Sequence, residues 1–119
     1  MLCPQDITAA NWVEFGRNSE QGSVFYYEKE SIKNINGFIY VWSMMDMTKE
    51  PVNGSYSVKI YDKIDCEMAR RQRLSYVFYE ENMGSGGPDY QDSNDKSWKY
   101  IVPGSFDETK MKLVCLIKD

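Results

Sequence analysis

Short runs of alternating apolar and polar residues recur along most of the chain and predict β-strands. The run 56–64 is the clearest, because aliphatic residues point to one side and polar or aromatic residues to the other. The run 37–46 is apolar on both faces, which is typical of a central strand that is covered on both sides. Similar patterns predict the remaining strands at 11–16, 23–28, 69–79 and 98–102.

The breaks in this pattern predict the connections and one helix. Glycine, proline, acidic and amide residues fill 82–97, which predicts a long loop, and turns are expected at 30–34 and 51–55. Ser105 and Glu108 match the capping box that opens a helix, and apolar residues then recur at helical spacing. Together these elements predict an α+β fold, with an antiparallel sheet of about six strands and a C-terminal α-helix packed on one face.

The length of 119 residues suits one domain. We assign residues 11–119 to that domain and residues 1–10 to a disordered or non-native N-terminal extension. No run of apolar residues is long enough for a transmembrane helix. The N-terminus has neither the charged nor the apolar part of a signal peptide, as expected of a chain from which a leader has been removed.

Charge and composition exclude several classes of function. The formal net charge is −4, which argues against a nucleic-acid-binding protein, because such proteins need an excess of Lys and Arg to meet phosphates. The chain has no histidine, which removes Ser-His-Asp and Cys-His catalytic arrangements and all His-ligated metal sites. We therefore expect a protein that is not an enzyme and that carries no cofactor and no metal.

The cysteines suggest an oxidising compartment. Cys66 closes a predicted strand, and Cys115 lies 49 residues later on the predicted helix, too far away for a CxxC redox pair or a compact zinc site. A structural disulfide between Cys66 and Cys115 is the best interpretation, and it implies export. Cys3 is left over, either as part of a processing or lipidation site or as an unpaired thiol at a chain end.

Basic and aromatic residues suggest a binding patch. If strands 56–64 and 69–79 are neighbours, with Ile60 and Leu74 facing the other side, five such residues share one face. They are Lys59, Tyr61, Lys63, Arg71 and Arg73. This face is either an ordinary solvated surface or a binding site for a polyanion, such as a sulfated glycan or an acidic segment of a host protein.

Several residues occur in a distinctive order along the chain. They are Trp12, Lys29–Ile32, Gly37, Trp42, Ser57, Asp65–Cys66, Met83–Gly86, Trp98, Pro103–Ser105 and Cys115. This order resembles the surface-adhesin protein E family of Gram-negative bacteria. The resemblance implies an exported domain with an antiparallel sheet, a C-terminal helix and a disulfide between the two matching cysteines. It also implies dimer formation and, for the founding adhesin, binding of host extracellular-matrix and plasma proteins.

Three functions are compatible with the sequence. The first is an exported binding module of the bacterial envelope, adhesin-like, located in the periplasm or on the outer-membrane surface, with or without a lipid anchor. The second is a periplasmic inhibitor or accessory protein of a cell-wall enzyme, acting through a loop such as 82–97. The third is a carrier of a small apolar ligand on the aromatic side of the sheet.

The central strand also predicts self-association. One helix of about 12 residues spans only ~18 Å, which covers no more than one face of a six-stranded sheet. The other apolar face then needs a second copy of the chain, giving a two-fold homodimer. The competing explanation is that the loop 82–97 folds over that face.

Overall fold

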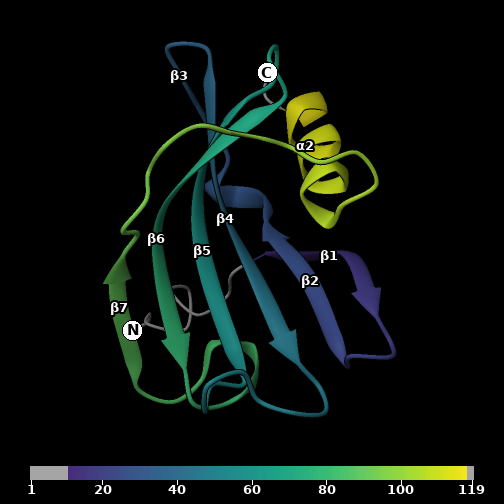
Figure 1. Cartoon of the computed structure of the whole chain (residues 1–119), viewed down its shortest axis with the longest axis vertical. Coiled ribbons are helices and arrows are strands. Elements are labelled where there is room, and N and C mark those ends of the chain that lie inside the picture. The colour runs from purple at the N-terminus through teal and green to yellow at the C-terminus, as the bar shows by residue number, and fades with distance from the viewer. Residues whose placement is uncertain (1–10, 118–119) are drawn as a thin grey trace, which may run out of the picture.

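The computed structural model describes residues 11–117 (Figure 1). In this range eight strands form one sheet, accompanied by two short 3-10 helices and one α-helix. The strands are β1 (Trp12–Asn18), β2 (Ser23–Glu28), β3 (Lys33–Ile35), β4 (Phe38–Met47), β5 (Ser57–Asp65), β6 (Arg70–Tyr79), β7 (Pro88–Asp92) and β8 (Lys99–Tyr100). The helices are η1 (Lys29–Ser31), η2 (Asn82–Gly84) and α2 (Phe106–Ile117). The predicted extension 1–10, with Cys3, lies outside the described residues.

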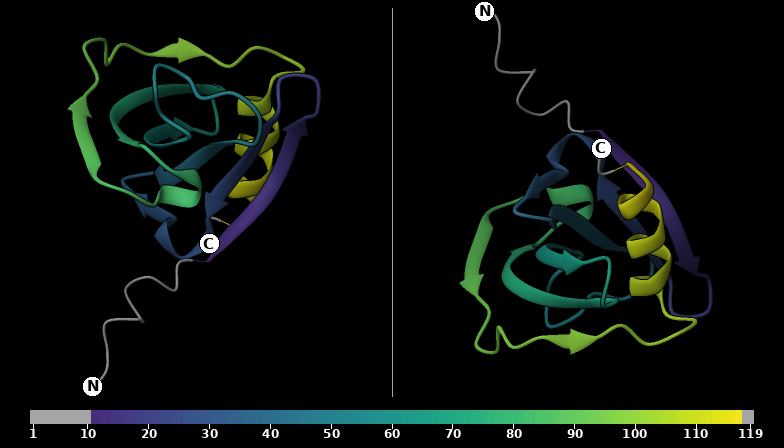
Figure 2. Two further views of the ribbon diagram at one scale, coloured as in Figure 1. Left: turned by 90° about the horizontal axis from the view of Figure 1, so that it is seen from below. Right: turned by 90° about the horizontal axis from the view of Figure 1, so that it is seen from above.

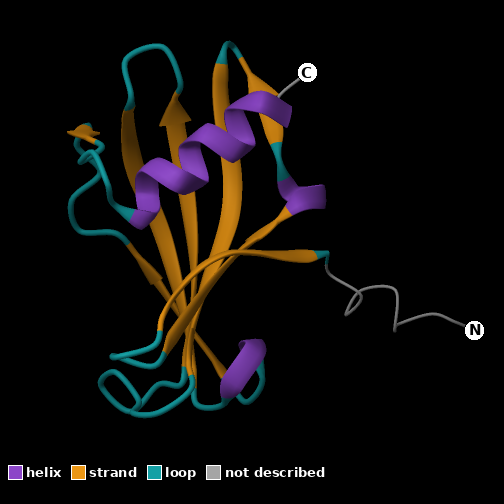
Figure 3. Cartoon of the chain, turned by 90° about the vertical axis from the view of Figure 1, so that its right-hand side faces the viewer, coloured by secondary structure: helices purple, strands orange, loops and turns teal. Residues whose placement is uncertain are grey.

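The sheet is antiparallel, with the strand order β1-β2-β4-β5-β6-β7, while β3 pairs with β4 and β8 pairs with β6. The strands β4 and β5 lie at its centre, and for β4 this position was predicted from its two apolar faces. The α2 helix crosses one face of the sheet (Figure 3). We call this side the helix face and the opposite side the open face. The predicted fold class, an antiparallel sheet with a C-terminal helix, is confirmed.

The helix face contains the apolar core. Its buried members are Tyr27, Ile39, Val41, Ile64 and Val114. Phe106 of α2 stacks on Phe25 of β2 with ring centroids 4.0 Å apart. Gly16 of β1 permits this approach, because a Cβ atom at position 16 would lie 2.7 Å from the Phe106 ring.

Two sequence-predicted features hold α2 in place. The disulfide between Cys66, directly after β5, and Cys115 of α2 is present in the structure. The Ser105 Oγ accepts a hydrogen bond from the N–H of Glu108 at 3.2 Å, as the capping box requires. The Glu108 carboxylate accepts its return bond from the N–H of Gly104 at 2.9 Å, one residue before the expected donor. None of the helices within residues 11–117 is long and apolar enough to cross a membrane.

The segment 82–97 is not the long loop that its composition predicts, because it contains η2 and β7. The η2 turn is fixed to β4, where the Asp46 carboxylate accepts hydrogen bonds from the Asn82 side chain and from the N–H of Met83. β7 adds a strand to the edge of the sheet. After β7 the chain runs round the outside of the molecule to α2 (Figure 2), and the predicted strand 98–102 shrinks to the two residues of β8.

Candidate functional site: the open face of the sheet

Alternate residues of β4, β5 and β6 build the open face. Trp42 pairs with Tyr61, which pairs with Ser75, so these three side chains form one row across the sheet. The rings of Trp42 and Tyr61 stack with centroids 4.7 Å apart. Lys59 and Val77 lie in the next row, two residues along each strand.

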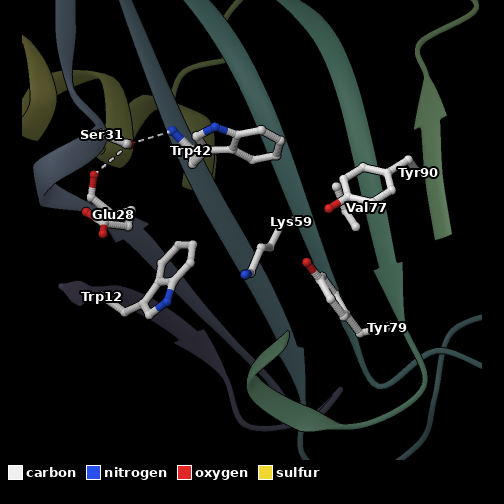
Figure 4. A pocket seen from close by; sticks show the side chains of 8 residues that line it. All are labelled: Trp12, Glu28, Ser31, Trp42, Lys59, Val77, Tyr79 and Tyr90. Carbon is white, nitrogen blue, oxygen red and sulfur yellow. Dashed lines mark hydrogen bonds between the residues drawn. The ribbon is translucent and has the colours of Figure 1, made fainter. Parts of the chain in front are cut away.

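A pocket of about 310 Å³ opens on this face beside the Trp42 row (Figure 4). Its lining comes from six strands and from η1. The lining residues are Trp12, Glu28, Ser31, Trp42, Lys59, Val77, Tyr79 and Tyr90. Figure 4 shows Lys59 reaching between Trp12 and Tyr79, and its Nζ lies 5.4 Å and 5.0 Å from the centroids of these two rings. The ammonium group is therefore held by aromatic faces, an arrangement worth about 0.5–1 kcal/mol per contact near a surface.

Ser31 fixes Trp42 at the wall of this pocket. The Trp42 N–H lies between the part of β4 that pairs with β3 and the part that pairs with β2. The Ser31 Oγ accepts the hydrogen bond of this N–H at 3.0 Å and donates its own to the Glu28 carbonyl oxygen at 2.8 Å. The backbone N–H of Trp42 therefore has a hydrogen-bond acceptor at a position where neither β2 nor β3 pairs with β4.

A second cluster of rings surrounds Lys63, one row beyond Tyr61 on β5. The Lys63 Nζ lies 4.5 Å from the Phe38 ring centroid, 5.8 Å from that of Tyr40 and 5.5 Å from that of Trp98. Arg70 of β6 also lies over the Trp98 ring, with its guanidinium carbon 4.4 Å from the ring centroid. All three tryptophans of the chain, Trp12, Trp42 and Trp98, thus lie on the open face.

Some charged groups of the open face have partners of opposite charge or hydrogen-bond partners, and others do not. Among the described residues, no carboxylate oxygen lies within 4.0 Å of the Nζ of Lys59 or Lys63. Arg70, in contrast, is paired with Asp65 at 2.9 Å. The Glu28 carboxylate accepts hydrogen bonds from the backbone N–H groups of residues 11 and 30. The acidic groups are therefore satisfied within the fold, whereas neither ammonium group has a carboxylate partner among the described residues and both lie against aromatic rings.

Burial shifts the pKa of ionisable groups on this face. It raises the pKa of Tyr61 and Tyr79 above the ordinary value of 10, so both phenols stay protonated and can donate hydrogen bonds. Burial also acts to raise the pKa of Asp65. Hydrogen bonds from the N–H of Met68 and from Arg70 outweigh it and lower the pKa below 3.8. Asp65 is therefore a carboxylate at neutral pH, and it forms an ion pair with Arg70.

The structure divides the five residues of the predicted patch between two faces. Lys59, Tyr61 and Lys63 lie on the open face, but Arg71 and Arg73 lie on the helix face, so the predicted shared face is wrong. The cause is a β-bulge, because Tyr61 pairs with Ser75 while Asp62 pairs with Arg73, which leaves Leu74 of β6 without a partner. One extra residue moves every side chain on the far side of the bulge to the opposite face.

The two displaced arginines belong to a network of charges beneath α2. Arg73 donates to Asp62 at 2.7 Å and to Asp107 of α2 at 2.8 Å, and Arg71 lies 3.6 Å from Asp107. The Lys110 Nζ contacts Asp62 at 2.6 Å. Asp62 and Lys110 are buried, so this network joins the helix to the sheet through its side chains.

Sequence reasoning missed Tyr90 and Trp98 as parts of the open face. Tyr90 stands in the segment 82–97, whose glycine and acidic residues conceal any alternation, and it is 74% exposed. Trp98 begins the predicted strand 98–102, to which no face was assigned from the sequence. The available signal at Tyr90 was an aromatic residue in an otherwise polar segment, since Tyr and Trp are enriched at binding interfaces.

Comparison with known proteins identifies the family. Residues 12–116 match the surface-adhesin protein E family, and the chain belongs to this family. Crystal form II of Haemophilus influenzae protein E has a TM-score of 0.71 at 17% identity, covering 90% of this chain and 88% of that chain. Its selenomethionine form has a TM-score of 0.70 at 18% identity, covering 98% and 93%. Protein E from non-typeable Haemophilus influenzae gives 0.68 at 18%, covering 98% and 82%.

None of the curated proteins matches this chain. The solved structures support the fold, and the family supports a surface adhesin-like protein with an exported or surface location. The family also suggests a role that is not enzymatic.

Proposed function

We propose that this protein is an exported binding module of the bacterial envelope, and that its open face binds a macromolecule of the host or of the envelope. The observation that carries this proposal is the grouping of three half-buried tryptophans and two lysines on the one face that α2 leaves uncovered. Aromatic residues enriched at one surface are typical of binding interfaces. Lys59, Tyr61 and Lys63 are the sequence-predicted binding residues that belong to this surface.

The location of the protein decides which macromolecule it meets. On the outer-membrane surface the open face would contact host molecules, as expected of an adhesin, and in the periplasm it would contact envelope components. Surface adhesin-like family membership favours the first location.

The two alternatives from the sequence have less support. An enzyme inhibitor acting through 82–97 would need a projecting loop, whereas η2 is hydrogen-bonded to β4 and β7 is part of the sheet. A carrier of small apolar ligands would need an apolar cavity. The pocket of about 260 Å³ beside α2 includes Arg73, Asp107 and Lys110 in its lining, and the open-face pocket includes Lys59 and Glu28.

Adherence of cells that display the protein tests this proposal. A non-adherent bacterial strain displaying the chain should bind to epithelial monolayers, and the double variant Tyr61→Ala/Lys63→Ala should lose most of that adherence. Lys112→Ala is the matched control, because Lys112 is exposed on α2, away from the open face. Equal adherence of the double variant and the parent, at equal surface expression, would contradict the proposal.

A further inference from the structure

We propose that the ligand of the open face is an acidic glycan, a linear chain of sugar rings that carries carboxylate or sulfate groups. This inference rests on the proposed function and specifies the ligand of the same surface. The binding track runs from the pocket around Lys59, across the stacked rings of Trp42 and Tyr61, to the ring cluster around Lys63.

The two ammonium groups determine the sign of the ligand's charge. Lys59 and Lys63 are half-buried, contact aromatic rings and have no carboxylate within 4.0 Å among residues 11–117. A ring face attracts a cation but cannot accept all three ammonium hydrogen bonds, so each group retains donors for an anion. A cationic ligand is disfavoured, because it would have to enter an aromatic pocket that the Lys59 ammonium already occupies.

The accessible aromatic surface determines the ligand's shape. The rings of Trp12, Trp42, Tyr79 and Tyr90 line the pocket, and Trp98 lies at the far cluster. Aromatic faces are apolar and electron-rich, so they pack well against the C–H-bearing face of a sugar ring. Phenol groups and lysines beside them can hydrogen-bond to hydroxyl and acidic substituents. The combination of ring faces with isolated cations matches a chain of charged sugar rings.

The spacing of the two lysines determines the ligand's length. Lys59 and Lys63 stand four residues apart on β5, so their Cα atoms are about 13 Å apart along the strand. The stacked pair of Trp42 and Tyr61 lies between them. One monosaccharide cannot contact both clusters, whereas an oligosaccharide with several acidic rings can.

Binding of defined oligosaccharides to the purified chain tests this inference. The probes are a heparin hexasaccharide, a hyaluronan hexasaccharide and neutral chitohexaose, at about 0.15 M salt so that unspecific charge attraction is screened. Because all three tryptophans lie on the open face, their fluorescence reports occupancy directly. At least one acidic hexasaccharide should bind and change this fluorescence, and chitohexaose should bind much more weakly. The comparison of the two acidic probes distinguishes sulfate from carboxylate recognition.

Charge-matched variants locate the site. Lys59→Gln and Lys63→Gln should each weaken binding of the acidic hexasaccharide about tenfold, since each removes one charge-assisted contact. Lys112→Gln removes the same charge from the outer surface of α2 and should change the Kd less than twofold. Trp42→Phe, which keeps an aromatic ring, should bind better than Trp42→Ala. Unchanged circular dichroism and melting temperature identify the variants that remain folded.

Two outcomes would overturn the inference. One is the absence of binding to both acidic hexasaccharides, and the other is an equal loss of affinity in Lys112→Gln and Lys63→Gln. If adherence to cells still depends on Tyr61 and Lys63 in either case, the proposed binding module stands and its ligand is a protein. If adherence is also independent of these residues, the proposed function fails as well.

Discussion

Lys110 and Asp62 are the most deeply buried opposite charges of the described chain, with exposures of 3% and 0%. The Asp62 Oδ2 accepts hydrogen bonds from Lys110 and from Arg73, and the Lys110 Nζ also donates to the Ser43 Oγ at 3.1 Å. The second oxygen of Asp62 has no hydrogen-bond partner among the described residues. Buried ions of this kind are tolerated only while every strong partner is present.

Replacing Lys110 by methionine should therefore destabilise the fold. The change leaves the Asp62 carboxylate buried with Arg73 alone, and we expect a loss of about 3 kcal/mol in the free energy of unfolding. Urea titration measures this loss, and the exposed Lys112→Met serves as the control, with a change below about 0.5 kcal/mol. Adding Asp62→Asn to Lys110→Met should restore part of the stability. A double variant less stable than Lys110→Met would disprove this role of the buried charge.

Asp107 should make stability dependent on pH in the acid range. Burial acts to raise its pKa, but the charges of Lys110, Arg73 and Arg71 outweigh burial and lower the pKa below 3.8. A carboxyl group with a lower pKa in the folded state stabilises the fold above its unfolded pKa, and this contribution is lost as the pH falls through the folded pKa.

The free energy of unfolding should accordingly stay level above about pH 5. It should fall as the pH drops below the pKa of the carboxyl group in the unfolded chain. Urea titrations from about pH 6 to about pH 2 measure this profile. In Asp107→Asn the fall should be shallower, although Asp65 still contributes. Profiles of equal slope for the parent and the variant would show that Asp107 does not carry the effect.

The placement of single charged residues was only partly predictable. Lys110 falls within the predicted helix, but the helical pattern contains no information on Asp62, which lies 48 residues away. Arg71 and Arg73 were predicted on the wrong face because alternation assumes an unbroken ladder. The bulge at Leu74 is a tertiary feature, and no glycine marks it in the sequence.

At the scale of elements, the disulfide connects the end of β5 to α2, and its two cysteines lie 49 residues apart in the sequence. The chain-entropy treatment of a loop of this length gives about 4 kcal/mol of stabilisation. We expect Cys66→Ala/Cys115→Ala to lose an amount of this order in urea unfolding without reductant. Reduced parent protein should show the same loss. Stability equal to that of the oxidised parent would mean that the charge network and the core hold α2 without the bond.

The central strands and the helix could be predicted because burial imposes a pattern on them. β4 and β5 face the core or the ring-lined surface along their whole length, and α2 has both a capping signal and an apolar stripe. β7 lacks such a pattern, because all five of its residues are exposed. An edge strand forms through backbone hydrogen bonds to β6, and these are compatible with almost any side chain.

At the scale of the molecule, the open face is the surface that the chain itself leaves uncovered. The loop that would have covered it, 82–97, instead extends the sheet and places η2 at one end of it. Self-association over this face, which the sequence predicts, stays a prediction. A second copy would compete with an acidic glycan for Trp42, Tyr61 and the two lysines.

This competition can be measured by light scattering at micromolar concentration. We expect a dimer of twice 13.9 kDa, and saturating acidic hexasaccharide should shift the mass toward the monomer, since one face cannot bind both partners. Lys63→Gln should weaken the effect of the glycan, and Lys112→Gln should not. A dimer that keeps its mass at saturation would place the subunit contact elsewhere. A monomer at all concentrations would rule out the homodimer while leaving glycan binding to be judged by the affinities alone.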